Sequence, residues 1–225
     1  MATNKIDKIR TALENAASAN KTYISFNNKK MDNIPSVSLL PVVTCPACKC
    51  SEKCYAAKMC NLYPSVMASY AKNTKFYKDK PNTYFASIVD QLNGLTMYRL
   101  FRWHVSGDVL NEDYLKGMVD VALKTPQTQF LAFTKRFDIV NTYISKGCVD
   151  GSNKIPDNLT IVFSAWDKSF KVDNPHNLPV AYCRFKDATQ NPEIPANAIP
   201  CKGNCSDCRY CFYLCNGMSV VFDEH

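Results

Sequence analysis

Apolar residues recur at helical spacing in several stretches of this 225-residue chain. Near the start, Ile6, Ile9 and Leu13 place one apolar face on a helix over residues 5–17. The same pattern predicts helices over 55–78 (with a break near Pro64), from 82 to beyond 92, and over 112–124 and 138–146. Each of these helices has one apolar face to bury, so a second layer of structure is expected to cover it.

Short apolar runs of strand length lie between these helices. They cover residues 22–26, 98–105, 129–134, 159–164 and 179–185, and a further apolar run at 37–43 leads into the first group of cysteines. From residue 98 onward strands alternate with helices, which is typical of a parallel sheet. Because the connections are short, we expect one α/β domain over residues 1–225, built as a partial parallel (β/α) barrel with cysteine-rich metal-binding segments.

Composition narrows the class of protein without choosing a function. The chain is 46% hydrophobic and 12% aromatic, as in globular proteins, and its net charge is +7. The basic residues are spread along the chain, so the charge permits nucleic acid as a partner but does not require it. The chain has no apolar run of membrane-spanning length and begins without a signal-peptide pattern, so a cytoplasmic protein with no membrane association is expected, in the host cell if the source is a virus.

Cysteines gather in two short windows. The first window, residues 45–60, contains Cys45, Cys48, Cys50, Cys54 and Cys60, and the second, residues 201–215, contains Cys201, Cys205, Cys208, Cys211 and Cys215. Disulfides are disfavoured in the cytosol, so clustered cysteines there indicate metal or redox chemistry, although an extracellular disulfide framework is the alternative. The preceding residues 191–200 have little apolar content, so metal ligation is expected to anchor this tail.

The spacing of the cysteines favours iron–sulfur over zinc. Zinc ribbons pair two knuckles that are far apart in sequence, whereas iron–sulfur segments string cysteines at short intervals. Zinc remains the alternative. The predicted metal ligands are Cys45, Cys50, Cys54, Cys201, Cys205, Cys208 and Cys211.

Polar residues follow the predicted strands, where the functional groups of parallel α/β sheets collect. Ser106, Gly107 and Asp108 end one strand, and their turn glycine and carboxylate predict a ligand-binding site. His104, Asp108 and Lys135 are the candidate catalytic residues. The competing interpretations are a carboxylate that caps the following helix and a buried structural histidine.

Residues 44–212 resemble a phage family, gene product 88. The resemblance rests on four pieces of sequence: Cys54-Tyr55-Ala56, the strand end from His104 to Asp108, Thr134-Lys135, and the cysteines of the second window. The combination is specific, although no single piece is.

The layout is also distantly similar to radical S-adenosylmethionine enzymes. That similarity implies a [4Fe-4S] cluster in the loop from Cys45 to Cys54, with one open iron that binds S-adenosylmethionine. It further implies that Ser106 to Asp108 hold the cofactor, that His104 and Lys135 face the substrate, and that the second window carries an auxiliary cluster. The cysteine spacing differs from the usual one, with four and then three residues between Cys45, Cys50 and Cys54.

Three functions are consistent with the sequence. The first is a cytosolic iron–sulfur protein of phage type, with a radical S-adenosylmethionine-like enzyme as its catalytic form. The second is a non-catalytic, metal-stabilised module that binds nucleic acid or a host protein. The third is a hydrolase or lyase that uses its cluster as a Lewis acid.

Overall fold

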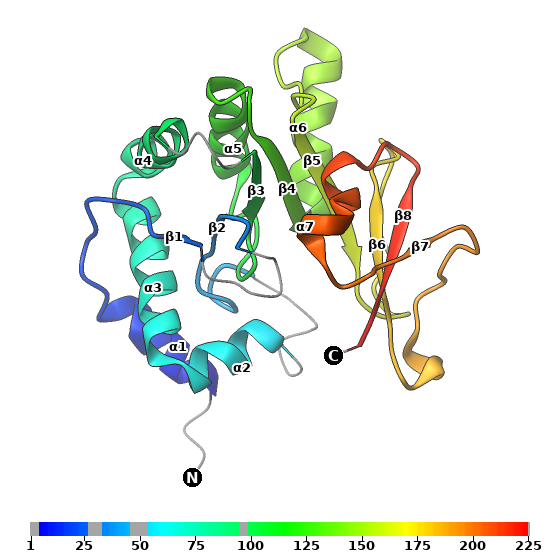
Figure 1. Cartoon of the computed structure of the whole chain (residues 1–225), viewed down its shortest axis with the longest axis horizontal. Helices are drawn as coiled ribbons and strands as arrows, with labels where there is room; N and C mark the ends of the chain where they lie inside the picture. The colour runs from blue at the N-terminus through cyan, green and yellow to red at the C-terminus, as the bar shows by residue number, and fades with distance from the viewer. Residues whose placement is uncertain (1–4, 27–32, 46–53, 95–98, 225) are drawn as a thin grey trace.

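An eight-stranded sheet forms the centre of the computed structural model, which describes residues 5–26, 33–45, 54–94 and 99–224 (Figure 1). Its spatial order is β1-β2-β3-β4-β5-β6-β8-β7, and it does not close on itself. The strands are β1 (Ile24–Ser25), β2 (Ser36–Val37), β3 (Leu100–Trp103), β4 (Gln129–Thr134), β5 (Leu159–Ala165), β6 (Val180–Arg184), β7 (Ile199–Pro200) and β8 (Ser219–Asp223). Only the β1–β2 pair is antiparallel, so the fold is mixed α/β around a mostly parallel sheet.

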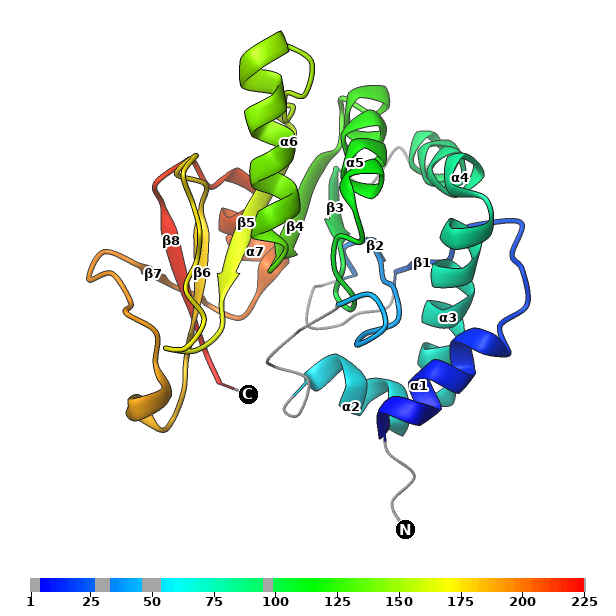
Figure 2. The ribbon, with the colours of Figure 1, turned by 180° about the vertical axis from the view of Figure 1, so that it is seen from behind.

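Helices cover one face of the sheet, and the C-terminal segment covers the other. The helices are α1 (Lys5–Glu14), α2 (Tyr55–Leu62), α3 (Pro64–Asp79), α4 (Pro81–Asn93), α5 (Glu112–Lys124), α6 (Phe137–Asp150) and α7 (Cys205–Cys208), with 3-10 turns η3 (Ala188–Gln190) and η4 (Tyr210–Tyr213). Helices α5 and α6 lie behind the sheet in Figure 1 and in front of it in Figure 2, whereas α7 lies on the opposite side. No described helix is long and apolar enough to cross a membrane.

Strand alternation divides the side chains of β3 and β4 between these two faces. Phe101, Trp103 and Phe130 are fully buried in the cluster that also contains residues of α4, α5 and α6. The Trp103 and Phe130 rings are stacked, with their centroids 6.2 Å apart. Leu131, between the inward residues of β4, instead belongs to the cluster on the opposite face.

The C-terminal cysteine-rich segment is docked on this opposite face. Phe212 of η4 is buried there, and its carbonyl oxygen accepts hydrogen bonds from Gln129 Nε2 (2.8 Å) and Thr160 Oγ1 (2.6 Å). The apolar cluster comprises Ile34, Leu131, Val162, Ala181, Phe212, Leu214 and Val220. The chain then continues into β8, which pairs with both β6 and β7. Metal ligation was expected to anchor residues 191–200. Strand pairing also holds the end of that tail, because Ile199 and Pro200 form β7 beside β8.

Most of the predicted elements are confirmed, and the departures have physical causes. Helix α5 and strand β4 have the predicted bounds, and Pro64 separates α2 from α3. Residues 166–179 connect β5 to β6 without an α-helix, so the alternation of strands and helices stops there. The run at 37–43 contributes only its first residue to β2, because the chain turns away from the sheet at residues 41–43. Strands β7 and β8 were not predicted, since both are short and adjoin irregular, cysteine-rich chain.

The close packing of α4 on α5 depends on Gly117. A Cβ at this position would lie 2.1 Å from Cε2 of Phe85, whose ring is itself wedged against those of Tyr84 and Tyr114. We expect Gly117→Ala to lower the free energy of unfolding by about 1–3 kcal/mol, because the clash exceeds the gain in helix propensity. Denaturant unfolding measures this change.

Gly94→Ala is the matched control. Among the described residues the added Cβ would meet nothing nearer than 3.6 Å, and Gly94 already has right-handed helical backbone angles. This variant should be neutral or more stable by about 0.4–1 kcal/mol. Equal stability of the two variants would contradict the packing argument.

Candidate functional site

A cavity of about 400 Å³ opens at the carboxyl ends of the parallel strands. Its wall on one side comes from Pro41, Val42 and Cys45 and from the start of α2, and on the other from the ends of β3, β4, β5, β6 and β8. Seven of the predicted site residues line it: Cys45, Cys54, His104, Ser106, Gly107, Asp108 and Lys135. The fold therefore brings two cysteines of the first window and all the candidate strand-end residues to one place.

Ser106 ties the end of β3 to the segment that leads into the first cysteine window. Its hydroxyl donates to the carbonyl oxygen of Leu39 (2.9 Å), and its own carbonyl accepts from the Leu39 amide (2.9 Å). Ser106 is 4% exposed, so these buried polar groups satisfy one another. The side chain that was predicted to bind a cofactor thus already supports the wall of the cavity.

Gly107 permits this wall to approach the strand end. Its φ is 86°, and a Cβ there would lie 2.8 Å from both Leu39 Cβ and Thr44 Oγ1. Glycine is needed both for the left-handed backbone and for the close contact. In the same wall Val42 has φ 69°, a conformation that is unusual for a β-branched residue and that turns the chain toward Cys45.

Asp108 joins the ends of β3 and β4. Its Oδ1 accepts from Thr134 Oγ1 (2.6 Å) and from the Val109 amide (2.7 Å), and its Oδ2 accepts from the Lys135 amide (3.0 Å). Burial raises the pKa of this carboxyl, and the three donors act in the opposite direction. Asp108 does not cap α5, since the side chain of Asn111 accepts from the Tyr114 amide there. Oδ2 keeps acceptor capacity for a ligand amine.

His104 is a buried, neutral imidazole at the end of β3. Its Nε2 lies 3.0 Å from the hydroxyl of Tyr114, which in turn lies 3.1 Å from the hydroxyl of Tyr84. Burial, with a smaller contribution from the Arg102 charge, lowers the pKa of His104 to about 3. Nδ1 has no hydrogen-bond partner among the described residues, and φ is 54°. The residue combines the features of a structural histidine with a place in the lining of the cavity.

Cys45 and Cys54 of the first cysteine window line the cavity. Cys54 is the N-cap of α2, where its sulfur accepts from the Ala57 amide (3.4 Å). Burial, and then the Asp108 charge, raise the pKa of Cys45 to about 11. Cys60, a residue of α2, is fully buried in an apolar cluster and does not line the cavity. Cys48 and Cys50 lie outside the described residues.

Arg102 was missed by the sequence analysis, and it lies between the cavity and the second cysteine window. It lines the cavity, and its guanidinium carbon lies 4.9 Å from the centroid of the Phe133 ring. Burial lowers the pKa of Arg102, and Cys205, Cys211 and Cys201 act in the opposite direction, so these thiols are its near neighbours. The sequence signal that could have found Arg102 is an arginine between two apolar residues of a predicted strand.

The second cysteine window gathers on the face opposite the helices. Burial, and then the neighbouring Cys201, Cys205 and Cys208, raise the pKa of Cys211 to about 12. Within the described part of the chain, however, no three His, Cys, Asp or Glu side chains are arranged to hold a metal ion. The four thiols are therefore close together without forming a finished coordination site. Other missed cavity residues are Ser164, Trp166, Tyr182 and Cys183.

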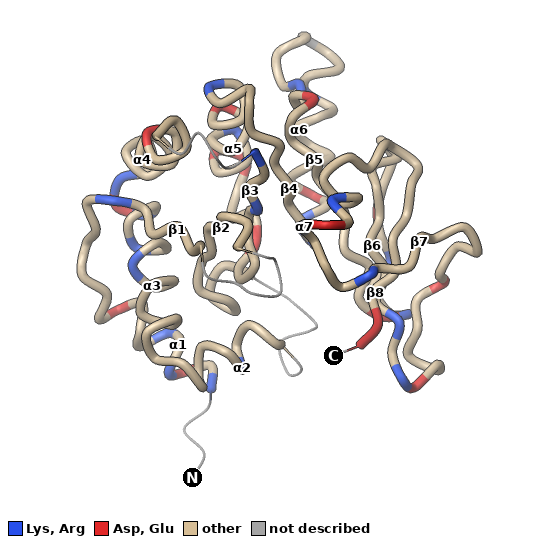
Figure 3. The backbone as a smooth tube through the Cα atoms, viewed as in Figure 1, with Lys and Arg blue, Asp and Glu red and all other residues tan. Residues whose placement is uncertain are grey.

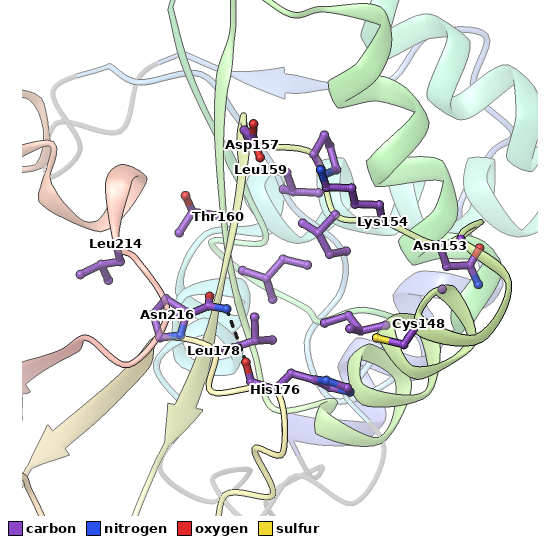
Figure 4. Close-up of a pocket in the computed structure, with 17 residues that line it drawn as sticks. Cys148, Asn153, Lys154, Asp157, Leu159, Thr160, His176, Leu178, Leu214 and Asn216 are labelled. Carbon is purple, nitrogen blue, oxygen red and sulfur yellow. Dashed lines mark hydrogen bonds between the residues drawn. The ribbon is translucent and has the colours of Figure 1, made fainter.

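A second cavity, of about 680 Å³, lies at the amino-terminal ends of β5 and β6 (Figure 4). Cys148, Lys154 and His176 line it, and Asn216 Nδ2 donates to the carbonyl oxygen of His176 (3.4 Å). None of the predicted site residues reaches it. Because ligands of parallel α/β sheets bind at the carboxyl ends of the strands, the first cavity is the better candidate.

This arrangement is that of an open parallel α/β protein with a cysteine segment at the mouth of its strand-end cavity. The chain belongs to the gene product 88 family, whose model matches residues 3–214. This confirms the phage family to which the motifs pointed. No curated protein and no solved structure matches the chain.

The neutral state of His104 predicts an acid-sensitive fold. The pKa is about 3 in the folded protein and about 6.5 in the unfolded chain, so between these values only the unfolded chain binds the proton. The free energy of unfolding should therefore fall as the pH drops below about 6.5, by up to about 1.4 kcal/mol per pH unit. Denaturant titrations between pH 4.5 and 7.5 (roughly the window set by these values) measure the slope.

His104→Asn should remove this contribution while fitting the left-handed backbone. His176→Asn is the control, because His176 is half-exposed and lies in the other cavity. An unchanged slope in His104→Asn would contradict the assignment of a neutral buried imidazole.

Proposed function

We propose that this chain is an iron–sulfur protein that binds a [4Fe-4S] cluster in the segment from Cys45 to Cys54 and a ligand in the adjoining cavity. Its catalytic form is a radical enzyme that uses S-adenosylmethionine. The observation that carries the proposal is that Cys45 and Cys54 line the same cavity as Ser106, Gly107 and Asp108.

The donor set suits the cluster. Iron–sulfur clusters are held by thiolates at short intervals, and Cys45, Cys50 and Cys54 supply three within ten residues. The amide of Ala57 already donates to Cys54 Sγ (3.4 Å), and N–H···S bonds of this kind tune such centres. A cluster with three protein ligands supplies an open iron and one-electron chemistry when it is bound.

The order of the elements supports the comparison with radical S-adenosylmethionine enzymes. Six strands, β2, β3, β4, β5, β6 and β8, are adjacent and parallel, as in a partial (β/α) barrel. The cysteine window follows β2, the first of them, and Ser106 to Asp108 follow β3, the second. This is the order that the resemblance implies.

The residues of this chain then have separate roles. Asp108 Oδ2 offers a carboxylate acceptor to a ligand ammonium group, while Oδ1 and the Ser106 hydroxyl hold the walls in place. His104 and Lys135 line the remaining volume, where the substrate would lie. The second window, Cys201 to Cys211, would hold an auxiliary metal centre. We place the protein in the cytoplasm of the host cell, where thiols remain reduced.

The other two functions have weaker support. A Lewis-acid hydrolase or lyase would use the same cavity and cluster without S-adenosylmethionine. A nucleic-acid-binding module would be favoured by a basic surface, but Figure 3 shows Lys and Arg interspersed with Asp and Glu over several elements. The cavity at the cysteine window therefore favours an enzyme.

Protein that is purified anaerobically should be brown and contain iron with acid-labile sulfide. Cys54→Ala should lose the iron of the first centre, because it removes a ligand at the cavity. Cys148→Ala is the control, since Cys148 is exposed and lies outside both windows. Iron and sulfide analysis with electron paramagnetic resonance measures the outcome, and a colourless protein with stoichiometric zinc would contradict the proposal.

S-adenosylmethionine should bind the iron-loaded protein, and Asp108→Asn should weaken binding at least tenfold, because an amide replaces a charge-assisted contact with the ligand amine. Asp167→Asn is the matched control, because Asp167 follows β5 without lining the cavity. Anaerobic calorimetry measures both, with unfolding of each variant followed in parallel since Asp108 also joins two strands. Absence of binding by the iron-loaded wild type would favour the Lewis-acid function.

A further inference from the structure

The half of the cavity that is lined by Phe133, Lys135 and Trp166 is aromatic and carries positive charge. Lys135 Nζ lies 5.7 Å from the centroid of the Trp166 ring, and the Arg102 guanidinium carbon lies 4.9 Å from that of Phe133. These are the two cation–π contacts among the described residues, and all four side chains line this cavity.

The Lys135 side chain is available to a ligand. Its backbone amide donates to Asp108 Oδ2 (3.0 Å), so the backbone of Lys135 is fixed at the end of β4. Among the described residues no carboxylate forms an ion pair with Lys135. A contact with an aromatic face orients an ammonium group without neutralising its charge.

The carboxylates at the cavity are engaged by the protein itself. Asp108 accepts three hydrogen bonds from the chain. At the rim, Glu224 Oε2 accepts from the Lys186 amide (3.1 Å), and Asp223 Oδ1 lies 3.4 Å from Arg184 Nη1. Lys135 therefore remains a cation of the lining that has no ion-pair partner among the described residues.

We infer that this half of the cavity binds the substrate and that the substrate is a flat aromatic ring that carries a phosphate or carboxylate group. The anion would meet Lys135, with the Ser164 hydroxyl nearby in the lining, and the ring would lie against the aromatic wall of Phe133 and Trp166. The whole cavity measures about 400 Å³, so a substrate that shares it with a cofactor is limited to a small ring system with its anionic group. This inference rests on the proposed function only in treating the ligand as the substrate.

Fluorescence of Trp166 reports on binding directly. The chain has two tryptophans, and the other, Trp103, is fully buried in the core. Anaerobically purified full-length protein, with its iron content measured, is titrated with adenosine 5′-monophosphate, 4-hydroxybenzoate, adenosine, inorganic phosphate and tyramine. We expect one of the two ring-bearing anions to bind and to quench the emission; which of them binds distinguishes a phosphate from a carboxylate source. Adenosine, phosphate and tyramine should each bind at least tenfold more weakly.

Variants assign the site. Lys135→Met should weaken binding of the ring-bearing anion at least tenfold, and Lys135→Arg should restore most of it, because the charge is retained. Lys154→Met is the matched control, since Lys154 lines the other cavity (Figure 4) and should leave binding unchanged. Calorimetry on Trp166→Phe, which lacks the reporter, should show weaker binding of the same anion.

The outcomes separate this inference from the proposed function. No binding of either ring-bearing anion, tighter binding of tyramine, or equal binding by Lys135→Met and wild type would overturn the inference even if the protein carries iron. Binding that depends on Lys135 in a protein that never carries iron would uphold the ligand site and overturn the proposed function.

Discussion

The shape of the cavity depends on one buried carboxylate. Asp108 accepts from the Thr134 hydroxyl and the Lys135 amide, so it holds the end of β3 against the end of β4 where the regular strand pairing stops. Burial of a carboxylate is unfavourable unless donors surround it, and here the chain supplies three. Because Lys135 is fixed through this contact, the same interaction that closes the strand ends also directs a cation into the cavity.

A second set of contacts brings the first cysteine window to these strand ends. The segment from Leu39 to Cys45 leaves the sheet after β2, pairs with Ser106 and packs against Gly107 at a distance that only glycine allows. Its position is thus set by backbone geometry before any metal binds. A cluster held at Cys45 and Cys54 would meet a wall that the protein has already built.

The two faces of the sheet are covered by different parts of the chain. One is buried under α4, α5 and α6 in an aromatic core, and the other receives the C-terminal segment, with Phe212 seated on β4 and β5. Arg102 points to this second face and lies close to both the cavity and the cysteines of the tail. The C-terminal segment is therefore part of the fold as well as a candidate metal-binding segment. Both cysteine windows lie near β3: Arg102 of this strand is close to the cysteines of the second window, and the segment that leads to Cys45 packs against Ser106 and Gly107, which follow the strand.

The sequence by itself determined the elements with strong periodicity and the polar residues at the strand ends. Helix α5, strand β4 and the polar residues that end β3 and β4 follow from local patterns, because the apolar spacing of each is complete within a few turns. Only the tertiary structure decided that β8 inserts between β6 and β7, that Ser106 and Asp108 bind the chain itself, and that Lys135, Trp166 and Arg102 share a cavity. These features join residues that are distant in sequence, and local patterns contain no information about which distant partner satisfies a buried polar group or an open strand edge.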